Sequence, residues 1–236
     1  METAMEPRQH APGKKEGLRL STLVWLFVIG SIIGYYLEGI SDFVGHGVWR
    51  PHTAAVWGHL NIIYGFGAIA AYVLAYHLSE RPLLVQFGWY AVSGALVEYV
   101  GSFLQELVFG SRSWDYSHQF LNLNGRVSLK MALLWGLLGV AFTHLLYQPI
   151  RRSFLSRPWR GERVLTTIMA SFLAVDLLVT SCAILRWKER IVTQTAPSNR
   201  VEQAIDKHFD DSRMEYLFHN MHFSAVLPQQ PEADVG

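Results

Sequence analysis

Five long apolar segments constrain this chain more than any other feature of its sequence. They are Ser21–Ile40, Trp57–His77, Leu83–Phe109, Leu129–Tyr147 and Val164–Leu185. A helix of about 20 apolar residues is long enough to cross the hydrocarbon core of a bilayer. Only 17% of the residues are charged, whereas a typical soluble domain has about 25%. Most of these charges lie between the apolar segments. We therefore expect an all-α fold, a polytopic transmembrane helix bundle of about five spans with a C-terminal amphipathic helix.

The polar ends of the chain differ from its apolar middle. We divide the sequence into a cytoplasmic N-terminal arm (1–20), a transmembrane helical domain (21–186), an interfacial or docking tail (187–226) and a disordered C-terminus (227–236). Within the tail, apolar residues recur at helical spacing among charged ones over Val201–Phe223, which predicts an amphipathic helix. Ser198 or Asn199 is suited to cap it. Such a helix lies on the membrane surface or docks on the bundle.

Basic residues predict the orientation of the bundle. Four lysines and arginines precede the first apolar segment, and five arginines lie in Gln148–Arg163. Cytoplasmic loops carry an excess of these residues, so we expect a cytoplasmic N-terminus. The basic residues Arg186, Lys188 and Arg190 directly after the fifth segment disagree with this assignment. Either the other basic residues outweigh them in setting the orientation, or one segment is broken or re-entrant. Leu83–Phe109 is the candidate for a broken or re-entrant segment, because it is the longest and carries two carboxylates.

Composition excludes several classes of site. The net charge of +1 gives no basic field for nucleic acid. The lone Cys182 cannot form an internal disulfide. His46, His52 and His59 are spaced too irregularly for a metal-ligand argument, so we expect no metal and no cofactor. The chain also has no P-loop, GxSxG or HExxH motif, and any use of ATP by the P-loop route would need a separate ATPase subunit.

Acidic side chains inside apolar segments are the best candidates for function. Placing a carboxylate in the bilayer centre costs roughly 2.5–3.5 kcal/mol on insertion scales, so such residues face a protein interior or a wet cavity. On the third segment, one helical stripe holds Gly94, Glu98, Gly101, Ser102 and Gln105. Either Glu98 serves a proton- or cation-linked pathway or a binding cavity, or it only bonds to a neighbouring helix. For Glu106 we favour a structural role as partner of Arg112 or Arg126.

Gly30 and Gly34 form a small-xxx-small pair on the first segment, which predicts close packing of this helix against another.

A polar loop after the third segment extends this candidate site. The predicted polar cavity comprises Glu38, Glu98, Glu106, Asp115, Asn122, Asn124 and Arg126. A second tier comprises Tyr64, Trp114, Tyr116 and Asp176. Asn124-Gly125 is a strong turn dipeptide, so an ordered interfacial loop is the alternative reading of this region. For Asp176 we expect His144 or a backbone group of a neighbouring helix as partner. We assign no catalytic residue.

Several motifs resemble one family, the small bacterial integral-membrane proteins called "putative ABC-transporter type IV" (CmpB-type) permeases. The matching stretches are Gly34-Tyr35-Tyr36-Leu37-Glu38, Ile63-Tyr64-Gly65-Phe66-Gly67, Glu98-Tyr99, Glu106 to Gly110, Trp114-Asp115-Tyr116-Ser117, Asn122-Leu123-Asn124-Gly125-Arg126, Trp135-Gly136 and Asp206 to Met221. The resemblance implies a helical bundle in a bacterial inner membrane. Trp49-Arg50-Pro51 and Gly58-His59-Leu60-Asn61 depart from the family pattern before its Ile-Tyr-Gly motif, in a region that would shape the mouth of a cavity.

Three functions follow as hypotheses. The first is a transport component that works in the lipid bilayer with a separate ATPase subunit or as a homo-oligomer. The second is a scaffold that docks a partner through its tail. The third is a membrane enzyme that acts on a lipid or envelope intermediate, with Asp115 or Glu106 as the acid or base. We rank them in this order.

Overall fold

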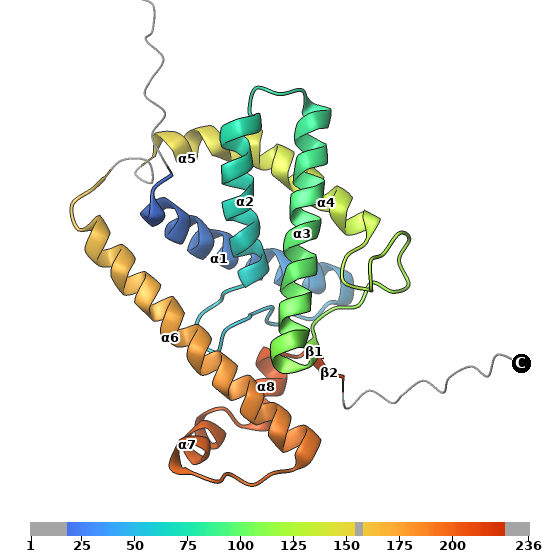
Figure 1. The fold of residues 1–236 in the computed structure, drawn as a ribbon, viewed down its shortest axis with the longest axis vertical. Helices are drawn as coiled ribbons and strands as arrows, with labels where there is room; N and C mark the ends of the chain where they lie inside the picture. The colour runs from blue at the N-terminus through green and yellow to red at the C-terminus, as the bar shows by residue number, and fades with distance from the viewer. Residues whose placement is uncertain (1–17, 154–157, 225–236) are drawn as a thin grey trace, which may run out of the picture.

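Long apolar helices make up most of the structure, a computed structural model that describes residues 18–153 and 158–224 (Figure 1). The helices are α1 (Leu20–His46), α2 (Ile62–Leu78), α3 (Leu83–Phe109), α4 (Leu129–Ala141), α5 (Gln148–Arg152), α6 (Glu162–Lys188), α7 (Arg200–His208) and α8 (Asp211–Leu217). A two-residue strand β1 (Ser111–Arg112) pairs antiparallel with β2 (His222–Phe223). The all-α prediction is therefore confirmed. The predicted arm up to residue 17 and the predicted disordered C-terminus lie outside the described residues.

The apolar surface of the long helices fits a bilayer. Among the described residues, four helical stretches are long and apolar enough to cross a membrane: α1, α3, the continuous stretch 129–152 and the stretch 162–193 that begins with α6. Many of their aliphatic side chains are exposed, for example Leu84 at 85% and Leu107 at 69%. Exposed apolar area on this scale marks a surface that another apolar phase covers.

The second predicted segment is shorter than expected. α2 has 17 residues and begins at Ile62, whereas the sequence suggested a helix from Trp57. The residues before Ile62 form an irregular segment, in which Gly58 has a positive φ of 82° and the backbone N–H of Trp57 donates to Asp176 on α6. The hydrogen bond to Asp176 therefore holds the backbone at Trp57 in an irregular conformation that is not part of α2.

The third segment is regular, and the prediction that it would be the irregular one is wrong. α3 runs unbroken for 27 residues to Phe109, and Gly110, with a left-handed φ of 64°, caps its C-terminal end. Among the described residues, π-helical stretches lie instead at Phe142–Tyr147, between α4 and α5, and at Glu189–Thr193, directly after α6. Pro149 follows the first of them within one turn. Because proline has no N–H and its ring crowds the carbonyl one turn earlier, Pro149 removes one α-helical hydrogen bond to this stretch.

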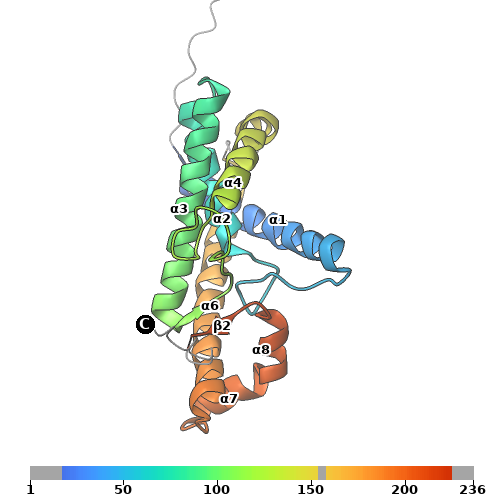
Figure 2. The ribbon, with the colours of Figure 1, turned by 90° about the vertical axis from the view of Figure 1, so that its right-hand side faces the viewer.

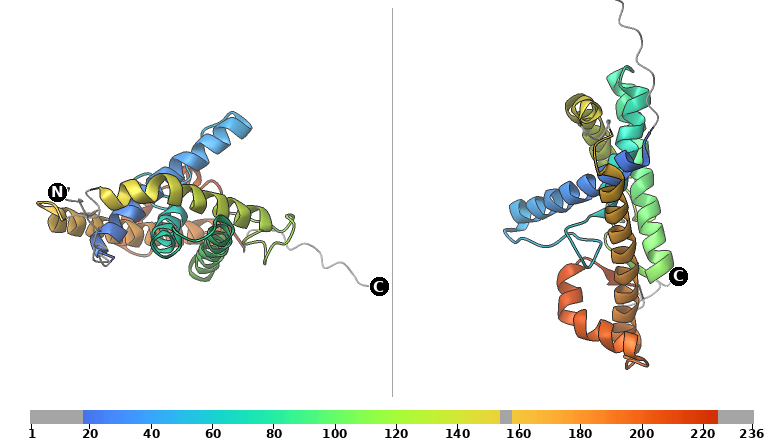
Figure 3. Two further views of the ribbon diagram at one scale, coloured as in Figure 1. Left: turned by 90° about the horizontal axis from the view of Figure 1, so that it is seen from above. Right: turned by 90° about the vertical axis from the view of Figure 1, so that its left-hand side faces the viewer.

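Glycines let α1 cross α2 closely. A Cβ placed on Gly30 would meet Ala68 and the backbone of Tyr64, and a Cβ on Gly34 would overlap the Tyr64 ring. The predicted small-xxx-small pair therefore does bring two helices together. α1 runs across the antiparallel α2–α3 hairpin at a steep angle rather than alongside it (Figures 2 and 3). This crossing places the end of α1 beside residues 47–61 and near the tail.

The tail docks on the end of α6. Instead of one amphipathic helix, it forms the short helices α7 and α8. Asn199 is the N-cap of α7, accepting hydrogen bonds from the N–H groups of Val201 and Glu202 at 2.9 and 3.0 Å, which confirms one of the two predicted caps. Apolar residues of the tail and of α6 share one core with Val56 from the segment between α1 and α2; its buried members are Val56, Ala183, Ile184, Trp187, Phe209, Met214, Phe218 and Phe223.

Two arginines hold the tail to α6. Arg186, which is 3% exposed, donates from Nε and Nη2 to the two carboxylate oxygens of Asp206 at 3.0 and 2.9 Å. Arg190 pairs with Asp206 as well and donates to Asp211 at 2.6 Å. Arg186 and Arg190, two of the three basic residues that disagreed with the predicted orientation, are therefore partners of acidic residues in the tail.

Candidate functional site

One face of α3 is buried at every fourth residue. Its buried residues are Gln86, Tyr90, Gly94, Glu98 and Ser102. Residues four apart in a helix lie one above the other on the same face. This stripe faces other parts of the protein: Tyr90 and Thr143, which follows α4, bond through their hydroxyls at 2.5 Å, and a Cβ on Gly94 would overlap Trp135 of α4. The predicted polar stripe therefore faces the protein and not lipid.

Glu98 lies at the centre of a small polar cluster. It is 4% exposed, and its Oε1 accepts a hydrogen bond from the Tyr116 hydroxyl at 3.2 Å. Glu38 on α1 accepts one from the Tyr64 hydroxyl on α2 at 2.6 Å. The two pairs are neighbours, since the Tyr64 hydroxyl interacts electrostatically with the carboxylates of both Glu38 and Glu98. We call Glu38, Tyr64, Glu98, Tyr116 and Trp135 the carboxylate–tyrosine cluster.

Trp135 packs the inner side of this cluster. Its ring fills the space that a Cβ would need at Gly67 on α2 and at Gly94 on α3, and its centroid is 5.5 Å from that of Tyr64. The indole of Trp135 also interacts with the carboxylate of Glu98. Even so, Trp135 Nε1 and Glu98 Oε2 are both buried without a hydrogen-bond partner among the described residues. A buried oxygen of this kind is costly unless it is protonated or binds a further group.

Glu106 belongs to a separate ionic group two turns further along α3. Its Oε2 accepts from Arg112 Nε at 2.7 Å and from Arg126 Nη2 at 2.5 Å. Arg126 is buried and also donates to Ser102 at 3.1 Å. Both arginines named as possible partners are therefore bound to Glu106. The predicted cavity held Glu38, Glu98 and Glu106 together, whereas the structure places Glu38 near Glu98 and pairs Glu106 with the two arginines.

The loop between β1 and α4 is held by its own polar groups. Asn124 and Gly125 both have positive φ, 54° and 68°, and Leu123 bridges to Val127 on either side of them. This is the geometry that an Asn-Gly turn predicts. Trp114 Nε1 donates to the carbonyl of Arg126 at 2.9 Å, which closes the loop over the end of α3.

The other polar residues of this loop serve it locally. Asn122 donates to the carbonyls of Ser117 and Gln119 at 3.0 Å each, and Asn124 donates to the Tyr99 hydroxyl at 3.0 Å. Asp115 accepts from the backbone N–H of Ser117 at 2.9 Å. The hydroxyl and N–H of Ser117 hold the pKa of Asp115 below its usual value. Asp115 and Asn124 are exposed, and their contacts orient the loop, which carries Tyr116 to Glu98.

Asp176 lies in a different place. It is fully buried on α6, where Oδ1 accepts from the backbone N–H of Trp57 at 3.2 Å and from the Thr180 hydroxyl at 3.3 Å. Thr180 in turn accepts from the N–H of Val56 at 2.9 Å. His144 is exposed and is not its partner. Asp176 therefore anchors residues 47–61 to α6, through a backbone group in a loop and not in a helix.

Sequence reasoning missed three of the residues that build these sites. The sequence motif that contains Trp135 gave it no role of its own, although a tryptophan opposite glycines on two other segments is a packing signal. Thr180 lies four residues after Asp176, the spacing that lets two side chains of one helix bond. Ser102 was placed on the stripe but was not recognised as the partner of Arg126.

Comparison with known proteins identifies one relationship. A family model described as "Putative ABC-transporter type IV" matches residues 25–181, which is more than half of the chain and includes the carboxylate–tyrosine cluster. Neither the curated proteins nor the solved structures gave a match.

Proposed function

From the premise that this chain belongs to the family described as "Putative ABC-transporter type IV", we propose that it is a multi-pass transport component whose carboxylate–tyrosine cluster binds the transported species. We place it in a bacterial inner membrane with a cytoplasmic N-terminus. A separate ATPase subunit would supply energy, because the sequence has no P-loop.

The observation that carries the proposal is the incomplete hydrogen bonding of the buried Glu98 carboxylate. Its Oε1 is bonded to Tyr116 and its Oε2 is buried with no partner among the described residues. A second carboxylate, Glu38, interacts electrostatically with it. Two neighbouring carboxylates with no basic partner in the cluster favour a proton or a positively charged solute. By contrast, Glu106 is held by two guanidinium groups and is suited to a structural role.

The tail argues for transport over scaffolding. Ile205 of α7 and Met214 and Leu217 of α8 pack in the core shared with α6, which leaves Val201 and Tyr216 as the large exposed apolar side chains of these two helices. An enzymatic role for Asp115 or Glu106 also has less support, because the contacts of both groups hold backbone or arginine side chains in place.

Transport assays on cells that express the chain together with its ATPase subunit test the proposal. Uptake of labelled ammonium, polyamine and alkali-metal cations, and proton movement, is compared between wild type and Glu98→Gln. Glu80→Gln, which changes an exposed carboxylate at the end of the α2–α3 turn, is the matched control. We expect one of these species to move in the wild type and the control, and its flux to fall at least tenfold in Glu98→Gln. Full flux in a folded Glu98→Gln variant, or no cation flux in the wild type, would refute the proposal.

A further inference from the structure

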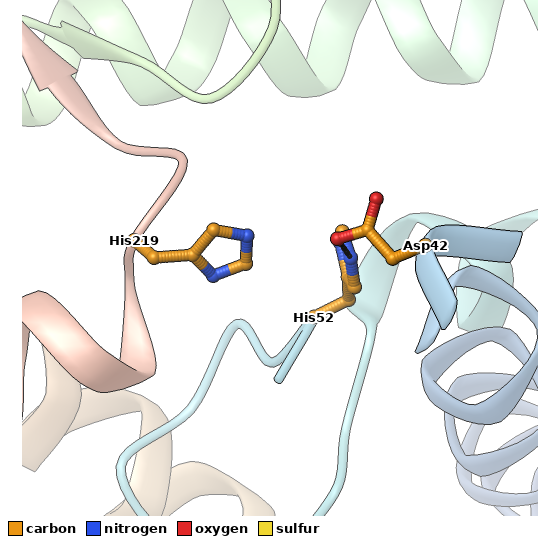
Figure 4. A group of neighbouring side chains, drawn as sticks. All are labelled: Asp42, His52 and His219. Carbon is orange, nitrogen blue, oxygen red and sulfur yellow. Dashed lines mark hydrogen bonds and ion pairs between the residues drawn. The ribbon is translucent and has the colours of Figure 1, made fainter. Parts of the chain in front are cut away.

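Two histidines and an aspartate from distant parts of the chain meet beside the end of α1. Asp42 is in the last turns of α1, His52 is in the segment 47–61, and His219 lies between α8 and β2. Figure 4 shows the His219 ring directed towards His52 and Asp42 from the opposite side. One possible ligand atom from each residue lies within 4.8 Å of the other two.

The geometry is close to that of a metal centre. His52 Nε2 and Asp42 Oδ2 are 3.0 Å apart, and the rings of His52 and His219 are 5.1 Å apart and nearly perpendicular. In a tetrahedral zinc site with bonds of about 2.0–2.2 Å, two ligand atoms are separated by roughly 3.3 Å. The hydrogen-bonded pair of His52 and Asp42 is therefore close to the separation that two zinc ligands need, and His219 presents a candidate ligand atom within 4.8 Å of both.

The segments that carry Asp42, His52 and His219 are anchored by contacts that do not involve these three side chains. Trp49 packs on Gly39 of α1, and the backbone of residues 53–60 is closed by the hydrogen bond from Ala54 N–H to the Leu60 carbonyl at 2.7 Å. On the other side, Phe218 is 2% exposed in the tail core. Held backbones of this kind preorganise a binding site.

We propose that Asp42, His52 and His219 bind one divalent transition-metal ion of the zinc type, which ties the tail to the end of α1. Two imidazoles and one carboxylate are a ligand set that zinc accepts, with a fourth position left for water. Sequence spacing gave no sign of this site, because His219 is far from the other two residues in the chain. The site is separate from the carboxylate–tyrosine cluster and does not depend on its function.

Two charged or ionisable neighbours bear on this proposal. Arg50 acts electrostatically on both Asp42 and His219, and a cation nearby opposes metal binding. His46 Nδ1 lies 3.3 Å from the second oxygen of Asp42 and is largely exposed. Replacing Arg50 should therefore strengthen binding, a change that a misfolded protein would not show.

Zinc binding to the full-length protein in detergent tests the proposal. The protein carries a purification tag without histidine, is stripped with a chelator, and is titrated with Zn²⁺ against a chromophoric competitor. We expect one ion per chain, and an affinity loss of about 100-fold or more in Asp42→Asn, His52→Gln and His219→Gln, since even outer-shell changes cost 10–100-fold. His118→Gln, an exposed histidine in the β1–α4 loop, is the matched control, and Arg50→Ala should bind more tightly.

The outcomes separate the alternatives. Equal zinc binding by wild type and the three ligand variants would mean adventitious binding to scattered histidines and would overturn the proposal. So would weaker binding by Arg50→Ala, or a site that takes Ca²⁺ or Mg²⁺ in place of Zn²⁺. As a second measurement, Zn²⁺ should protect the tail from limited proteolysis in wild type and in His118→Gln, but not in His219→Gln.

Discussion

Replacing Asp206 with asparagine should weaken the docking of the tail on α6. The carboxylate binds Arg186 through two hydrogen bonds of 3.0 and 2.9 Å and also pairs with Arg190. Removing one partner of a fully buried ion pair costs about 3–5 kcal/mol, and an exposed pair contributes about 0–1 kcal/mol. The Asp206 side chain is 20% exposed, and Arg186 keeps Glu189 as a partner.

These contacts place the cost between the two limits, at about 2 kcal/mol. Since 1.4 kcal/mol corresponds to a factor of ten, docking should weaken about 30-fold. Amide hydrogen exchange, which measures local opening, should show this loss of protection in α7 and α8, with α3 unchanged. Glu215→Gln, an exposed change on α8, is the control. If Asp206→Asn exchanges no faster than Glu215→Gln, the ion pairs do not hold the tail.

The same latch should depend on pH. Arg186 lowers the pKa of Asp206 below its usual value. The ion pairs therefore contribute fully above the ordinary aspartate pKa of about 3.9, and their contribution is lost as the pH falls through the lower pKa of the folded protein. Protection of α7, corrected for intrinsic exchange, should stay constant from about pH 8 to pH 5 and decline only below about pH 4. Loss of protection near pH 6 would implicate a histidine instead.

Three further changes test the packing. Gly94→Leu should lower the melting temperature in detergent, because a new side chain overlaps the tryptophan beside it and overpacking costs about 1–3 kcal/mol, whereas Gly88→Leu, where a Cβ meets nothing within 4 Å, should change little. Asn199→Ala removes the α7 cap and should weaken the exchange protection of α7 by about 1 kcal/mol. Thr180→Val leaves the N–H of Val56 without its acceptor and should destabilise the protein by about 1–3 kcal/mol, as measured by thermal unfolding, with Thr180→Ser retaining most of the stability.

Local patterns predicted the helices well because hydropathy and capping act over a few residues. The unbroken apolar length of α3, the glycine pair on α1, the Asn199 cap and the Asn124-Gly125 turn can all be recognised without knowledge of distant contacts. The start of α2 could not be predicted in this way, because Asp176 on α6 determines where the backbone before Ile62 goes.

Sequence alone determined that this chain is an all-helical membrane protein with carboxylates inside its first and third apolar segments, since apolar length and charge placement are properties of each segment by itself. Only the tertiary structure decided which groups meet. The crossing of α1 over α2 brings Glu38 near Glu98, whereas Glu106 forms ion pairs with arginines. The docking of the tail brings His219 to Asp42 and His52. Such pairings depend on how helices far apart in the chain pack together, and no periodicity within one segment encodes them.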